Sequence, residues 1–147
     1  MQTFNNRKKR SRGVAIVLTT LTMAVTLPLI GLGFDVATLY VVKSKLAAAA
    51  DSAALAGARA LSQGSTSAGQ TSSAVNTAQS FFSGNFPAGY WRSSGASASV
   101  VVDSTSFPNY RTVTVTATAQ APLYFLRVLK QQASTINVIS KAGRRDV

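Results

Sequence analysis

The sequence predicts an α+β protein in which a single-pass transmembrane helix continues into a long Ala-rich helix and then into a small antiparallel-sheet domain. Three observations predict this class: a basic cluster followed by an uncharged apolar stretch, an Ala-rich segment without strong helix breakers, and a C-terminal half with alternating apolar and polar residues. We therefore expect four parts: a basic cytoplasmic N-terminus at 1–12, a transmembrane helix at 13–34, an extracytoplasmic helix at 35–61 and an extracytoplasmic α+β domain at 62–147.

Residues 13–34 form the candidate membrane span. None of these 22 residues is charged. As a helix they extend about 33 Å, which is close to the ~30 Å hydrocarbon core of a bilayer. Hydroxyl groups within the span can bond back to the preceding helical turn, and they belong to Thr19, Thr20, Thr22 and Thr26. A cleaved secretory signal is the alternative, although the apolar run of such a signal is typically only ~7–15 residues.

Five basic residues precede the span: Arg7, Lys8, Lys9, Arg10 and Arg12. Because positive residues stay on the cytoplasmic side, we expect the N-terminus inside the cell and the C-terminal domain outside. The same cluster is a candidate contact for anionic lipid headgroups. Within the span, Pro28 predicts a helix kink near residues 25–28, since proline removes a backbone hydrogen bond. Gly31 and Gly33 either allow another helix to approach or reflect the frequency of glycine in membrane helices.

Residues 35–61 are rich in Ala and Leu, the best helix formers. With the span they predict one helix of about 48 residues, or ~70 Å. An apolar stripe at three- and four-residue steps runs along it, formed by Leu39, Val42, Leu46, Ala50, Ala53, Gly57 and Leu61. The stripe either packs on the protein's own C-terminal domain or forms a small-residue seam for another helix. Both interpretations stay open at this point.

Three short motifs stand at the ends of the span and beyond it. They are Arg12-Gly13 before the span, Asp35-x-x-x-x-Tyr40 at its exit, and an Ala-Ala-Asp-x-Ala-Ala-Leu-Ala-Gly-Ala block at 49–58. Over about residues 10–60 the chain resembles the N-terminal region of the TadE/TadG-like proteins of bacterial Tad (Flp) pilus assembly. The resemblance implies a non-enzymatic, single-pass component of the bacterial inner membrane. Its partners would be membrane lipid and the helices of other assembly proteins or of a second copy.

Six residues are candidates for helix docking: Asp35, Tyr40, Ala50, Asp51, Ala54 and Gly57. The alternative function is a pilin-like minor subunit that is processed near Gly13 and incorporated in a filament. The processed members of the family carry Glu as the fifth residue of the mature chain, whereas cutting after Gly13 places Leu18 there. The uncleaved interpretation is therefore favoured. From the order of the elements we expect a long helix crossed on a three-stranded antiparallel sheet, which is a pilin-like arrangement.

The pattern of residues 62–147 predicts the elements of the outer domain. We expect a polar linker at 62–73, helices at 68–83 and 123–130, and strands at 98–103, 111–119 and 134–140. A turn at 106–110 joins the first two strands into a hairpin. We expect Trp91 to cover a small core and the tail 141–147 to be mobile.

Composition excludes most catalytic and metal chemistry. The chain has a net charge of +11 and contains no Cys, no His and no Glu, so zinc sites, thiol catalysis and imidazole catalysis are absent. We expect no enzymatic activity, no cofactor and no small-molecule substrate. Asp103 begins a stretch that superficially resembles a metal-binding loop, but we assign it to a turn. The positive charge lacks an aromatic-basic motif: five basic residues precede the span and the others are spread along residues 35–147. No nucleic-acid partner is therefore expected.

Overall fold

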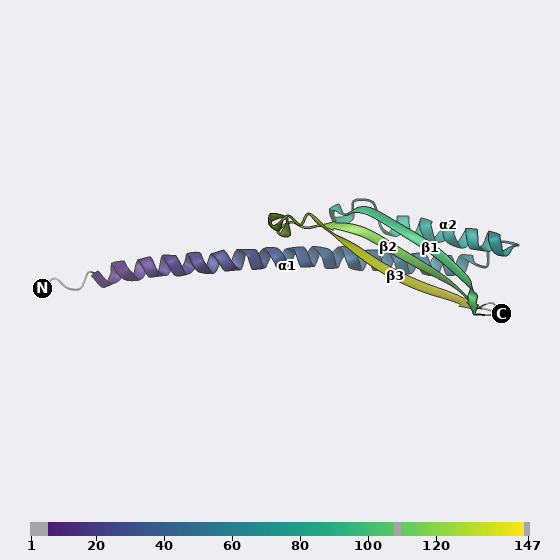
Figure 1. The fold of residues 1–147 in the computed structure, drawn as a ribbon, viewed down its shortest axis with the longest axis horizontal. Helices are drawn as coiled ribbons and strands as arrows, with labels where there is room; N and C mark the ends of the chain where they lie inside the picture. The colour runs from purple at the N-terminus through teal and green to yellow at the C-terminus, as the bar shows by residue number, and fades with distance from the viewer. Residues whose placement is uncertain (1–5, 108–109, 146–147) are drawn as a thin grey trace.

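A computed structural model describes residues 6–107 and 110–145 of the chain. The elements are α1 (Asn6–Ala60), α2 (Ser67–Asn85), the 3-10 helix η1 (Tyr90–Arg92), β1 (Ser94–Phe107), β2 (Tyr110–Pro122), the 3-10 helix η2 (Leu126–Leu129) and β3 (Ala133–Arg145). The predicted α+β class is confirmed. α1 runs through Pro28 as one helix, and its N-terminal part extends far beyond the remaining elements (Figure 1).

The N-terminal part of α1 has the surface expected of a membrane span. Residues 13–30 are exposed without exception, and α1 is the one helix among the described residues that is long and apolar enough to cross a membrane. The predicted threonine bonds are present: the hydroxyls of Thr19, Thr20, Thr22 and Thr26 each donate to the carbonyl four residues earlier at 2.8–2.9 Å. A helix with its polar side chains satisfied in this way suits a surrounding without water.

The sheet is antiparallel, with strand order β1-β2-β3. Because side chains alternate along a strand, β2 divides its residues between two faces. Val113, Val115 and Ala117 are fully buried on one face, whereas Thr114 and Thr116 lie on the more accessible opposite face. The pairing across the three strands keeps this division, since Val115 lies opposite Val100 of β1 and Ser140 of β3.

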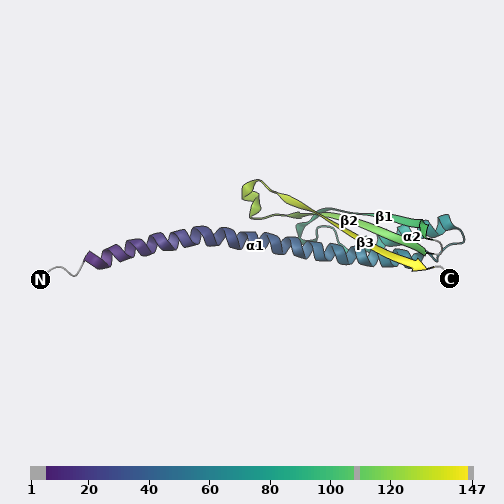
Figure 2. The same cartoon turned by 60° about the horizontal axis from the view of Figure 1, so that its bottom comes forward.

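Two helices cover the apolar face of the sheet. α1 packs against β2 and β3, while α2 packs against β1 and against α1 (Figures 1 and 2). The apolar stripe predicted on α1 supplies much of this core, with Val42, Leu46, Ala50, Ala53 and Leu61 fully buried. At Gly57, an added Cβ would lie 3.1 Å from the Ala74 carbonyl and 3.2 Å from the Ala78 Cβ. The small stripe residues therefore let α2 approach α1 closely.

Side chains satisfy backbone groups where α1 ends and α2 begins. The Arg111 guanidinium donates to the Leu61 carbonyl at 3.3 Å and to the Gln70 Oε1 at 2.6 Å, and Arg144 donates to the Arg59 carbonyl at 3.3 Å. Cationic donors are favourable there because the last carbonyls of a helix lack intrahelical partners. Thr66 caps α2 by accepting from the Gly69 N–H.

Several local expectations are wrong in detail. Trp91 is 49% exposed, so it does not cover the core. The predicted helix at 123–130 is reduced to the single turn η2, because Pro122 ends β2 instead of beginning a helix. The predicted tail belongs to β3 as far as Arg145. Of the predicted turn at 106–110, residues 108–109 lie outside the described part, as do residues 146–147 of the tail.

Candidate functional site

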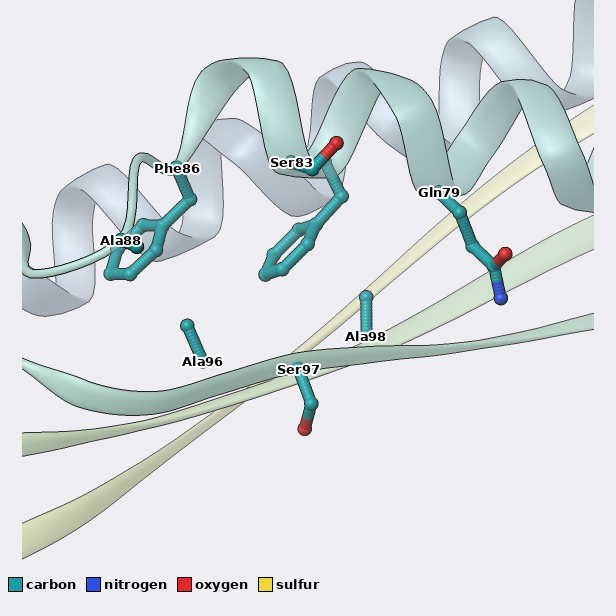
Figure 3. Close-up of a pocket in the computed structure, with 8 residues that line it drawn as sticks. Gln79, Ser83, Phe86, Ala88, Ala96, Ser97 and Ala98 are labelled. Atoms are coloured by element: carbon teal, nitrogen blue, oxygen red, sulfur yellow. The ribbon is translucent and has the colours of Figure 1, made fainter.

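The described residues contain no group of side chains suited to hold a metal ion. No three His, Cys, Asp or Glu residues come together among them. Asp103 belongs to β1, where it lies opposite Thr112, and not to a turn as the sequence suggested. A pocket of about 380 Å³ opens between α2 and β1 (Figure 3), where Ala96 and Ala98 point toward α2 and Ser97 points to the opposite face. Its lining holds no titratable group.

The most unusual polar group is Asp35, which lies one residue beyond the apolar segment 13–34 and is 0% exposed. Its carboxylate receives hydrogen bonds from three consecutive backbone N–H groups at the start of η2. Oδ1 accepts from Tyr124 at 2.7 Å, Oδ2 accepts from Leu126 at 2.8 Å, and both oxygens are within 3.2 Å of the Phe125 nitrogen. One side chain of α1 thereby fixes the connection between β2 and β3.

The charge of Asp35 is stabilised by these backbone donors. Burial raises the pKa of the carboxyl, but the hydrogen bonds from Leu126, Tyr124 and Phe125 lower it by more, so the pKa lies below its ordinary value. A buried carboxylate without such partners would be strongly unfavourable. Asp35 therefore remains ionised and holds the connection as an anion.

Aromatic packing surrounds this carboxylate. The Phe34 ring makes edge contacts with Tyr124 and Phe125, at centroid distances of 5.5 and 6.4 Å. The Phe125 ring also lies directly over Gly31, where an added Cβ would overlap with that ring. Gly31 is thus a position of close approach. The sequence suggested that another helix could approach there, but the approaching group is the chain's own β2–β3 connection.

The structure separates the six predicted docking residues into two groups. Ala50, Ala54 and Gly57 are buried in the core, and Asp35 is buried in the contact just described. The other two are accessible: Tyr40 is 72% exposed, and Asp51 is exposed while its Oδ1 accepts from the buried Ser140 hydroxyl. The basic residues 7–12 belong to the first turns of α1.

Sequence reasoning did not find that Tyr124, Phe125 and Leu126 bind Asp35. The only signal was a strongly apolar stretch, Leu-Tyr-Phe-Leu-Arg-Val-Leu, directly after Pro122 and between two strands. From the sequence alone, such a stretch predicts a helix, because nothing shows that it lies beside the span in three dimensions. The pairing of residues 89 to 91 positions apart needs the three-dimensional structure.

Comparisons with known proteins agree with the motifs along α1. No curated protein and no solved structure matches the chain. The model of the Tad family, described as Flp pilus-assembly TadE/G-like, matches residues 13–60. These are the residues of the apolar segment and of the stripe that organises the core. Over residues 13–60 the chain is thus similar to the TadE/G-like Flp pilus-assembly family, which confirms the resemblance seen in its motifs and indicates a membrane-anchored protein with a role in pilus assembly.

Proposed function

We propose that the protein is a non-enzymatic, single-pass component of a Tad/Flp-type pilus-assembly system in the bacterial inner membrane, and that it docks on partner proteins through α1. The observation that carries this proposal is the coincidence of the family match with one helix. Residues 13–60 supply both the apolar anchor and the support of the sheet. A helix with these two tasks is suited to hold an extracytoplasmic domain at a fixed place in a membrane assembly.

The proposed orientation places residues 1–12 in the cytoplasm and residues 35–147 outside, with the membrane crossed by residues 13–34. Five Lys and Arg residues precede the span, whereas the first basic residues after it are Lys43 and Lys45. This charge difference favours a cytoplasmic N-terminus. The basic cluster Arg7, Lys8, Lys9, Arg10 and Arg12 would then bind the anionic headgroups of the inner leaflet.

The proposed docking surface is the exposed side of α1 just above the span. Val36 is 58% exposed and Tyr40 is 72% exposed, and Lys43 is exposed as well. Residues four and three apart share one face of a helix, so these three side chains form one strip. Of the six candidates from the sequence, Tyr40 is central to this strip, whereas Ala50, Ala54 and Gly57 are occupied within the protein.

Site-specific photo-crosslinking in native membranes tests the docking surface. A photo-reactive phenylalanine analogue at Tyr40 should form adducts with inner-membrane proteins of the pilus-assembly system or with a second copy of the chain. The same analogue at the exposed Ile139 of β3 is the matched control. Adducts at position 139 equal to those at position 40, or none at position 40 in cells that assemble pili, would contradict docking through α1.

The alternative function is a pilin-like minor subunit that is processed near Gly13 and enters a filament. Its pilin-like element is the packing of a long helix on a three-stranded sheet. The N-terminus of the protein in membrane and filament fractions separates the two functions. An intact N-terminus carrying Arg7–Arg12 supports the membrane-anchored component, whereas a new N-terminus at Val14 in sheared filaments supports the subunit.

A further inference from the structure

The connection between β2 and β3 reaches back toward the N-terminus along α1, farther than any other part of the sheet and farther than α2 (Figures 1 and 2). We call Leu123–Lys130 the tip. Its side chains line an apolar groove of about 580 Å³ together with α1 residues of the span. The groove is formed by Leu27, Pro28, Leu29 and Leu32 of α1 and by Phe125, Leu126, Val128 and Leu129 of the tip.

The position of this groove determines the depth of the tip. Leu32 and Leu27 precede Phe34, the last residue of the apolar segment, by two and seven positions. At ~1.5 Å per residue they lie about 3 and 10 Å below the exit of the helix from the bilayer. The predicted span of about 33 Å exceeds a hydrocarbon core of ~30 Å by only about 3 Å, so both residues lie at or below the outer edge of that core. Residues that contact Leu27–Leu32 from the side therefore lie at the depth of lipid and not of water.

The exposed side chains of the tip match that surrounding. Val128 is 85% exposed, Leu129 is 70% exposed and Phe125 is 50% exposed. Adjacent apolar residues with this exposure are unfavourable in water, because transfer of their surface from water to an apolar medium lowers the free energy. Two cations stand among them, since Arg127 and Lys130 are also exposed. Apolar side chains with basic residues beside them are typical of segments that lie in a membrane interface.

Backbone N–H groups of the tip have hydrogen-bond acceptors within the protein and do not depend on water for them. The carboxylate of Asp35 satisfies three N–H groups at the start of the tip. Turn hydrogen bonds satisfy others, from Val128 to the Phe125 carbonyl and from Lys130 to the Arg127 carbonyl. Irregular backbone is tolerated at membrane depth only where its polar groups have partners. Asp35 thus removes the main obstacle to inserting a non-helical connection among lipids.

We propose that the tip is a second membrane contact of this protein, which inserts among the phospholipids of the leaflet that α1 leaves. Val128 and Leu129 lie among the acyl chains, and Arg127 and Lys130 bind headgroup phosphates. Asp35 acts as a positioning residue that holds the tip beside the span. The proposal depends on the membrane span alone, so it stands whether or not the protein assembles a pilus.

Fluorescence quenching by brominated phospholipids tests the depth of the tip. Trp91 is the single tryptophan of the chain, so a Trp91→Phe background accepts one new tryptophan at a time. The full-length protein is reconstituted in vesicles of brominated phosphatidylcholine and phosphatidylglycerol. Val128→Trp is compared with two exposed references, Leu29→Trp in the span and Ile139→Trp on β3.

We expect Val128→Trp to lose emission nearly to the extent of Leu29→Trp and to emit at shorter wavelength than Ile139→Trp. The vesicles hold only this protein and lipid, so quenching identifies lipid as the contact. Emission of Val128→Trp that is quenched no more than that of Ile139→Trp overturns the proposal. If that unquenched emission is also shifted to shorter wavelength, a second copy of the chain covers the tip instead.

A second variant, combined with Val128→Trp, tests the role of Asp35. In Asp35→Asn the side chain keeps its size, but an NH2 donor replaces one of the two oxygens that accept from the three N–H groups. Quenching of the Val128→Trp emission should therefore fall toward the Ile139→Trp value. Amide hydrogen exchange at residues 124–126 should increase in the same variant. Asp51→Asn is the control, because Asp51 contacts Ser140 in β3 and not the tip. Unchanged quenching and exchange in Asp35→Asn overturn the assignment of Asp35 as the positioning residue.

Discussion

The two parts of α1 belong to one uninterrupted helix but have opposite relations to their surroundings. Residues 13–30 are exposed on every side and carry no charge, whereas the part from 38 to 60 has a buried stripe and an accessible face. Leu21 is 62% exposed while Leu46 is 0% exposed. Apolar side chains are thus distributed around the whole helix in one part and restricted to one side in the other.

This difference shows how the surrounding medium determines sequence pattern within a single helix. A helix in lipid has no polar side, so every position can be apolar. A helix that covers a sheet meets protein on one side and water on the other, so its apolar residues follow a stripe. Asp35 lies near the boundary, four residues beyond Gly31, which the Phe125 ring covers.

The largest expected effect concerns the buried stripe. Leu46→Ala should lower the free energy of unfolding of the sheet and its helices by about 2–5 kcal/mol, because it leaves a cavity in a closely packed core. Leu55 lies on the same helix but is 49% exposed, so Leu55→Ala should cost less than about 1 kcal/mol. Denaturant unfolding of the full chain in micelles measures both. Equal losses would show that the two sides of this part of α1 are equivalent.

The second prediction compares leucine-to-lysine substitutions in the two parts of α1. Leu21→Lys should reduce the membrane-inserted fraction, since lysine near the middle of a span costs about 2.5–3.5 kcal/mol. Leu55→Lys, in the part that packs on the sheet, should leave insertion unchanged. Resistance to alkaline carbonate extraction measures the fraction retained in membranes. An equal loss of membrane retention in both variants would argue against a boundary near Phe34.

The smallest expected effect concerns the end of α1 that lies far from the membrane. Arg111→Met removes the donors to the Leu61 carbonyl and to Gln70, and should lower the free energy of unfolding by about 0.5–1.5 kcal/mol. Arg92 is exposed, so Arg92→Met is the matched control with little expected change. Thermal unfolding monitored by circular dichroism compares the two. No difference between them would mean that water replaces the lost bonds.

Local periodicity predicted most of the fold. Alternation in residues 111–119 identified the strand β2, and the stripe from Leu39 to Leu61 identified the side of α1 that is buried. These features depend on residues within a few positions of one another. The packing of the stripe on the protein's own sheet was one of two open interpretations, and the structure supports it for the stripe residues.

Long-range features were not predictable in the same way. Nothing in the sequence relates Asp35 to Tyr124, and the apolar stretch after Pro122 suggested a helix because its neighbours were unknown. Trp91 was expected to cover a small core, but Phe82 and Phe86 provide the buried aromatic surface instead. Three of the docking candidates, Ala50, Ala54 and Gly57, belong to a seam of small residues, and small size equally suits packing within one chain.

The absence of a break in α1 between the apolar segment and the sheet has a mechanical consequence. A helix longer than the thickness of its bilayer relieves the mismatch by tilting, commonly by ~20°. Because residues 35–60 continue the same helix, they form a lever of about 39 Å that must tilt too. A tilt of ~20° would displace its far end sideways by about 13 Å. The position of the sheet relative to the membrane would therefore depend on the thickness of the bilayer.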